Sequence, residues 1–233
     1  MTIGMGRTII ETAPPADAPA HPALAAEDVR YVVRDFLSLV AVCAGRAETE
    51  SDVRRFMAEG LLPRATYVLP DGTEMMPADY FALADRAGGA RALPAWFRRR
   101  LGQELAALGM EPSPGRLDEE WSGYASGEYG VCLRAVSPEN IAAKAHLMGA
   151  IEGLLEEPRP GEGEWRESLR RSVDQLDRML REFATCDRLR FGGPVSRDRL
   201  VTAVRERYAG IWDAASDAVG CPERGSSTGS SDG

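Results

Sequence analysis

The residues best suited to chemistry gather around one predicted turn. Residues 67–69 form a short apolar run, residues 70–73 form a turn cluster that contains a glycine, and Glu74 begins a second run. This order predicts a small β-hairpin. The hairpin places the carboxylate of Glu74 on a stiff element beside the aromatic residues Tyr80 and Phe81. A positioned carboxylate can transfer protons, although a solvated surface charge is the commoner role for a glutamate on a hairpin edge.

Composition narrows the classes of protein to which the chain can belong. With 233 residues, of which 44% are hydrophobic, it can bury a core as one domain or as a domain with a subdomain. The 28 Lys and Arg against 36 Asp and Glu give a net charge of -8, which opposes nonspecific binding to nucleic acid or to an anionic membrane. We therefore expect neither partner.

Cysteine and histidine usage argues against a metal site. The four cysteines lie far apart without a CxxC pair, and the two histidines, His21 and His146, are remote from them in sequence. No run of 18 apolar residues suggests a membrane span, and the first residues lack the apolar core of a signal peptide. We expect a cytoplasmic protein with reduced thiols and no cofactor.

The elements that would hold Glu74 are mostly helices. Apolar spacing predicts a helix over residues 27–43, and Thr49 with Asp52 resembles a capping box that opens a second helix ending at Gly60. Pro77 suits the first position of a third helix, which would carry Tyr80 and Phe81.

The second half of the chain reads as helices throughout. Residues 117–134 carry glycines at spacings of three and four, which predict either a small-residue stripe that another backbone can approach closely or a break into two short helices. Further helices are expected from Pro94, from Ser137, along the stripe from Trp165 to Phe183, and from Ser196.

The predicted fold is mainly α. It has a tail over residues 1–25, a winged-helix-like subdomain with one small β-hairpin over 26–90, a helical part over 91–219 and a disordered tail over 220–233. We expect the pocket between the subdomain and the helical part.

The order helix, turn, helix, hairpin resembles the winged helix-turn-helix of MerR-type regulators over about 50 residues. In that family the second helix enters the DNA major groove. Here Glu48, Glu50 and Asp52 surround the start of that helix and would repel phosphates, and Arg54 and Arg55 offset them only in part. We therefore expect a retained scaffold without DNA binding.

Most of the ordered chain resembles a bacterial natural-product family that includes the Pictet-Spengler cyclases of β-carboline alkaloid biosynthesis. The motifs that carry this resemblance are GLLPRATY, the hairpin ending EMMPADYF, and DEEWSGYASGEYGVCL followed by SPENI. The resemblance implies condensation of tryptophan, or a tryptophan derivative, with an aldehyde, followed by ring closure onto indole C2. It also implies a homodimer and cofactor-independent acid/base catalysis.

By this resemblance Glu74 is the catalytic carboxylate. It would protonate the leaving hydroxyl of the carbinolamine and later take the proton from indole C2. Related cyclases have a histidine about ten residues earlier, where this chain has Arg64, which could bind a substrate carboxylate through two parallel donors.

The remaining predicted substrate-binding residues are aromatic or acidic. Trp121, Tyr124 and Glu128 could share one helical face, which would suit an indole with an ammonium group. Tyr80, Phe81 and Tyr129 could stack on the ligand or hydrogen-bond it, although such aromatics are more often part of a core. Two other functions stay open, a MerR-like ligand-sensing regulator and a non-catalytic ligand-binding protein.

Overall fold

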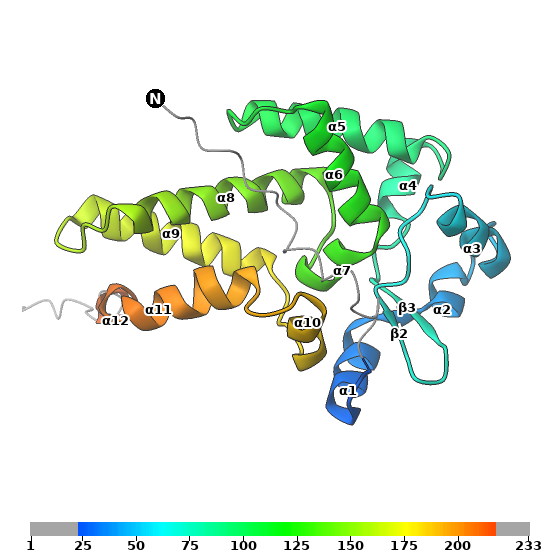
Figure 1. The fold of residues 1–233 in the computed structure, drawn as a ribbon, viewed down its shortest axis with the longest axis horizontal. Helices are drawn as coiled ribbons and strands as arrows, with labels where there is room; N and C mark the ends of the chain where they lie inside the picture. Colours follow the sequence, from blue (N-terminus) through cyan, green and yellow to red (C-terminus); the bar gives the residue numbers. More distant parts are fainter. Residues whose placement is uncertain (1–22, 218–233) are drawn as a thin grey trace, which may run out of the picture.

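A computed structural model describes residues 23–217, so the predicted tails fall almost wholly outside the described part. The fold is mainly helical with one small antiparallel sheet, as predicted. The sheet and the first helices form one end of the molecule, and the long helices of the second half extend away from them (Figure 1). No helix in residues 23–217 combines the length and the apolar character needed to cross a membrane.

The first predicted helix is interrupted. Helix α1 (Ala26–Asp35) stops before Phe36, strand β1 (Leu37–Ser38) follows, and only then does helix α2 (Leu39–Cys43) begin. The single helix predicted over 27–43 is therefore wrong. Phe36 is 3% exposed and packs edge-on against Tyr67 of the hairpin, which holds the chain extended at this point.

The predicted second helix is confirmed as α3 (Glu50–Ala58), and the Thr49 and Asp52 capping box is present. The hairpin is confirmed as well, with strands β2 (Tyr67–Val68) and β3 (Glu74–Met76) in register so that Val68 faces Glu74. Strand β1 pairs with the other edge of β3, which makes three strands in the order β1-β3-β2. The third strand was not predicted, since two residues carry too weak a pattern.

The segment after the hairpin is a turn rather than the predicted start of a helix. The Tyr80 amide donates to the Pro77 carbonyl and the Ala82 amide donates to the Asp79 carbonyl, so residues 77–81 turn tightly. Helix α4 (Ala82–Ala87) begins only afterwards and ends at Gly88, which has φ 86°. The irregular backbone directs Asp79 and Tyr80 towards the second half of the chain.

The second half is built from helices in sequence order. Ser137 caps a helix that begins with proline, as predicted, and Ser113 caps another that was not predicted to begin there. The bounds of these helices are α5 (Leu93–Ala107), α6 (Pro114–Ala125), α7 (Glu128–Cys132), α8 (Pro138–Glu156), α9 (Gly163–Met179), α10 (Thr185–Arg190), a π-helical turn (Asp198–Thr202), α11 (Ala203–Arg207) and α12 (Gly210–Asp217).

One predicted helix is shorter than expected, and one pair of predicted alternatives is decided by the structure. The stripe predicted to run from Trp165 to Phe183 stops with α9, because Leu180 becomes extended and pairs with Leu133 in an isolated β-bridge. The stretch 117–134 divides into α6 and α7, the second of the two predicted alternatives.

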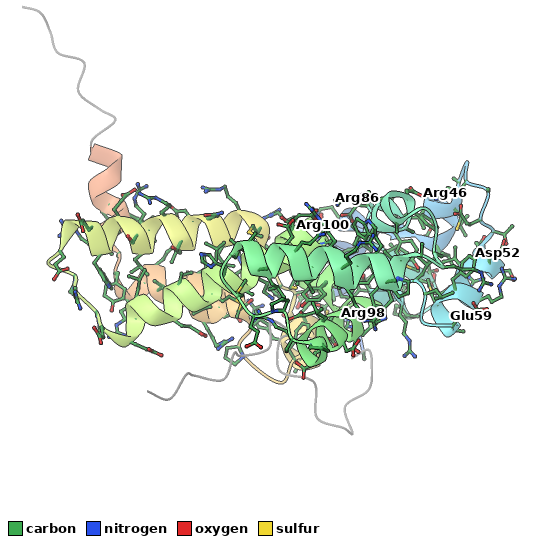
Figure 2. All side chains as sticks on the ribbon, turned by 90° about the horizontal axis from the view of Figure 1, so that it is seen from above. Arg46, Asp52, Glu59, Arg86, Arg98 and Arg100 are labelled. Carbon is green, nitrogen blue, oxygen red and sulfur yellow. The ribbon has the colours of Figure 1, made fainter. Side chains whose placement is uncertain are left out.

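One core runs through both halves of the molecule. Buried side chains of α1, α3 and the sheet join those of α5 to α11 in a single hydrophobic cluster. The long helices α8 and α9 lie side by side (Figure 1) and bury residues such as Ile151 and Val173 completely. The outer surface is covered by charged side chains, among them Asp52, Glu59 and Arg98 (Figure 2).

Candidate functional site

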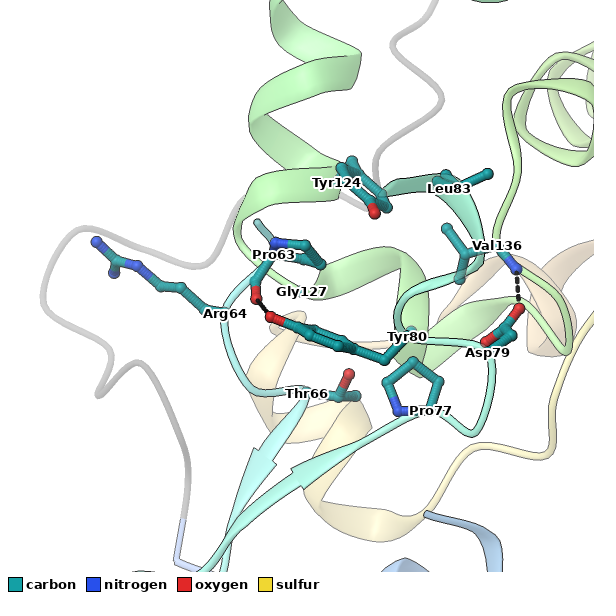
Figure 3. A pocket seen from close by; sticks show the side chains of 11 residues that line it. Pro63, Arg64, Thr66, Pro77, Asp79, Tyr80, Leu83, Tyr124, Gly127 and Val136 are labelled. Carbon is teal, nitrogen blue, oxygen red and sulfur yellow. Dashed lines mark hydrogen bonds between the residues drawn. The ribbon is translucent and has the colours of Figure 1, made fainter. Parts of the chain in front are cut away.

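A cleft lies where the turn after the hairpin meets helices α6 and α7. It contains about 340 Å³ of empty space, the open mouth included. Its lining comes from residues 63–83 on one side and residues 124–136 on the other (Figure 3), namely Pro63, Arg64, Thr66, Pro77, Asp79, Tyr80, Leu83, Tyr124, Gly127, Gly130 and Val136.

Two glycines bring the walls of the cleft together. Gly127 has φ 85°, and a Cβ there would lie 2.7 Å from the Arg64 carbonyl oxygen. A Cβ at Gly130 would clash with the hydroxyl oxygen of Thr66. The close approach is fixed by the Arg64 amide, which donates to the Ala125 carbonyl at 2.9 Å. The approach occurs at and after the break between α6 and α7, not along a glycine stripe on one helix.

Tyr124 supplies a buried hydroxyl to the cleft. The residue is 4% exposed, and its hydroxyl points into the cavity (Figure 3). Within residues 23–217 no side chain or backbone group forms a hydrogen bond with that hydroxyl. Burial raises the pKa of Tyr124, and the negative charge of Asp79 adds to the effect, so the phenol remains a proton donor at neutral pH. A hydroxyl that lines the cleft can donate a hydrogen bond to a ligand oxygen.

Asp79 supplies the carboxylate. One of its oxygens, Oδ2, accepts the Val136 amide at 3.2 Å (Figure 3). No arginine or lysine of the described part pairs with Asp79. Neighbouring carboxylates differ in this respect, since Asp85 binds Arg46 at 2.6 Å and Glu139 binds Arg86 at 2.7 Å. Asp79 thus offers a carboxylate at the cleft with which no cation of residues 23–217 forms an ion pair.

Aromatic rings form the rest of the wall. Tyr80 is 3% exposed and uses its hydroxyl to donate to the Pro63 carbonyl at 2.7 Å, so its ring is held across the cavity (Figure 3). Behind Tyr124, the ring of Phe97 stacks at 5.0 Å and Trp121 lies at 5.4 Å. These contacts make the aromatic wall rigid.

Glu74 lies outside this cleft. Its carboxylate accepts from Arg54 Nε at 2.7 Å on the outer face of the hairpin, where the Glu74 side chain is 24% exposed. It does not belong to the cleft lining. Its catalytic role stays a prediction from the family resemblance.

The other predicted residues divide into three groups, of which two lie in or beside the cleft lining. Arg64, Tyr80 and Tyr124 line the cleft, although the guanidinium of Arg64 points away from it (Figure 3). Phe81 and Trp121 are buried beside the lining, where Phe81 packs against Tyr80 and under the guanidinium of Arg46.

Glu128 and Tyr129 belong to a polar cluster behind the cleft. Burial raises the pKa of Glu128, and the positive charge of Arg190 opposes the rise. Tyr129 is buried and donates to Glu120, while Lys144 donates to Cys132 Sγ at 3.5 Å. This cluster ties α6, α7 and α8 together and has no side chain in the cleft lining.

Sequence reasoning missed two residues of the site, Asp79 and Thr66. Asp79 falls within the helix predicted from Pro77 and was not singled out as a site residue. An acidic residue between a proline and two aromatic residues is itself a signal of a functional site. Nothing in the sequence indicated Thr66, because its role depends on the close approach of Gly130. No group of three or more metal-ligating side chains occurs within the described range.

Comparison with known families identifies the second half of the chain. Residues 93–209, half of the chain, match the model of a family of unknown function, DUF6058. The chain belongs to this family. The match includes the cleft wall of Tyr124, Gly127 and Gly130 but stops short of the turn that carries Asp79. Neither the curated proteins nor the solved structures contain a match.

Proposed function

We propose that the cleft binds an indole-bearing amine and that the protein condenses it with an aldehyde in a Pictet-Spengler cyclisation. One observation carries this proposal: the Asp79 carboxylate and the Tyr124 hydroxyl both line an aromatic cleft, and within residues 23–217 neither has a side-chain partner. An ammonium group is attracted both to a carboxylate and to aromatic faces. The indole would lie along the rings of Tyr80 and Tyr124.

The two polar groups suit the successive steps. The Asp79 carboxylate takes a proton from the bound ammonium, the free amine adds to the aldehyde carbon, and the Tyr124 hydroxyl can donate to the aldehyde oxygen as it gains charge. Asp79 then returns its proton to the carbinolamine hydroxyl, which leaves as water and gives an iminium ion that the Asp79 carboxylate stabilises. Indole C2 forms the new carbon–carbon bond, and Asp79 accepts the C2 proton. The balance is one amine plus one aldehyde giving one cyclic amine plus one water.

This assignment places the acid/base role on Asp79. Glu74 would have to give up its 2.7 Å contact with Arg54 before it could serve the same chemistry. Phe81 and Trp121 would shape the wall, since they hold Tyr80 and Tyr124 in place. The resemblance also implies a homodimer, which light scattering on the purified protein tests.

The DNA-binding alternative receives less support from the surface of α3. Arg54 is paired with Glu50 and Glu74, and Arg55 is paired with Asp52 and Glu59. Side chains neutralised in this way have little charge to offer DNA phosphates. We therefore rank small-molecule chemistry above regulation.

The test is incubation of the purified protein with indole amines and a panel of aldehydes, followed by mass spectrometry. The expected result is a product equal in mass to the two reactants less one water, formed faster than with heat-denatured protein. Chromatography against authentic tetrahydro-β-carboline separates the cyclised product from the open imine of equal mass. Equal rates with native and denatured protein would reject the enzymatic proposal.

A further inference from the structure

We infer that the cleft selects an indole amine that lacks a free carboxylate, in preference to the amino acid itself. This inference rests on the proposed function and concerns the substrate class of the same site. It follows from the uneven distribution of positive and negative charge among the side chains that line the cleft.

Negative charge dominates the lining. Among the lining residues Asp79 is the one acid, and Arg64 is the one residue with a cationic side chain. The guanidinium of Arg64 is exposed and directed away from the cavity (Figure 3). The remaining lining side chains are aromatic, aliphatic or hydroxyl-bearing. An ammonium group therefore finds a partner in the cleft, whereas a carboxylate finds none in this arrangement.

Two arginines on or against the segment that follows the hairpin already have partners. Arg46 binds Asp85 and Glu48, and Arg86 binds Glu139. Recruiting either one for a ligand would leave a protein carboxylate without its cation. The hydroxyls of Tyr124 and Thr66 can each donate one hydrogen bond, but neither neutralises a charge.

The geometry of an α-amino acid explains why it matters that no cationic side chain of the lining points into the cleft. Its carboxylate and its ammonium group are attached to the same carbon, so an ammonium bound to Asp79 brings the two carboxylates close together. Like charges at such short range disfavour each other strongly where solvent is partly excluded. Tryptamine, or an ester of tryptophan, keeps the indole and the ammonium without this repulsion.

The experiment compares tryptamine, tryptophan methyl ester and tryptophan with one common aldehyde. We expect kcat/KM for tryptamine and for the ester to exceed that for tryptophan by roughly ten-fold or more, as the loss of one charged partner implies. A tryptophan value equal to or above that of the ester would overturn the inference. If Arg64→Ala then removed the activity towards tryptophan, the result would show that the Arg64 side chain turns into the cleft and binds the carboxylate.

Binding measurements keep the inference testable apart from catalysis. If none of the three amines is turned over, the proposed reaction fails, and calorimetry with the same ligands still decides the charge preference. Tryptophol, which has the indole and a hydroxyl in place of the amine, is the matched control ligand. We expect Asp79→Asn to weaken tryptamine binding roughly ten-fold or more and tryptophol binding by much less. Equal effects on the two ligands would reject an ammonium site at Asp79.

Discussion

The outer face of the hairpin and the cleft behind it contain two carboxylates that lie close in sequence but in different surroundings. Glu74 is paired with Arg54 at 2.7 Å, and that arginine is also within 3.3 Å of Glu50. Asp79 accepts a hydrogen bond from one backbone amide and lines the cleft together with Tyr124. The first carboxylate is already satisfied by the protein, whereas the second retains capacity for a ligand.

This difference separates two roles that a sequence motif cannot tell apart. An exposed ion pair on a hairpin contributes little stability, typically about 0 to 1 kcal/mol, and its charge is screened by solvent. A carboxylate beside an aromatic cavity can bind a cation or move a proton. The predictions below test this contrast, beginning with the largest expected effect.

Asp79→Asn should lower turnover roughly 100- to 10,000-fold, the usual contribution of a positioned acid/base group. Asparagine keeps an oxygen that can accept the Val136 amide, so the fold should persist. Steady-state kinetics measures the loss, and circular dichroism checks the fold. A folded variant with turnover within a few-fold of the wild type would remove Asp79 from the mechanism.

Gly127→Ala should destabilise the cleft side of the molecule by at least about 2 kcal/mol, through an unfavourable φ and the contact with the Arg64 carbonyl. Gly115→Ala is the matched control, because a Cβ at Gly115 in α6 meets no heavy atom within 4 Å. Urea unfolding of both variants measures the difference. Similar unfolding free energies would show that the walls need no close approach.

Tyr124→Phe should weaken ligand binding by roughly 2- to 12-fold, the value of one hydrogen bond of about 0.5–1.5 kcal/mol. Stability should be unchanged or slightly higher, because the hydroxyl has no partner within residues 23–217. Calorimetric binding and thermal unfolding measure the two effects. A large loss of stability with unchanged affinity would mean that the hydroxyl serves the fold.

Glu139→Gln tests a second ion-paired carboxylate of the outer surface. Burial alone would raise the pKa of Glu139, but hydrogen bonds from Arg86 and its other donors hold it at about 2, below its ordinary value of 4.5. Its stabilising effect is thus present above about pH 4.5 and disappears as the pH falls towards 2. Urea unfolding across this range should show the wild type losing its advantage over the variant. A difference that does not depend on pH would contradict this account.

Glu74→Gln should have the smallest effect. We expect a loss of no more than about 1 kcal/mol in the free energy of unfolding, since the pair with Arg54 is solvent-exposed. Turnover should stay within a few-fold of the wild type. A loss as large as that of Asp79→Asn would instead support the catalytic role that the family resemblance assigns to Glu74.

The sequence determined the elements whose signals are local. Thr49 with Asp52 and Ser137 with Pro138 mark helix starts that the structure contains, because a cap and its helix lie within one turn of the chain. The hairpin could be predicted for the same reason, since its turn residues and its two strands are adjacent in sequence. Tyr80 and Tyr124 were recognised as candidates from residue type alone.

Tertiary structure decided where the chain departs from its local pattern. The helical spacing over 27–43 continued through Phe36, but packing of that ring on Tyr67 and pairing of β1 with β3 broke the helix. Which carboxylate faces the cleft depended on Arg54, a residue of α3 that satisfies Glu74. Thr66 meets Gly130 only because two distant segments approach closely. Contacts between segments far apart in sequence leave no periodic trace in either of them, and for that reason only the folded structure shows the cleft.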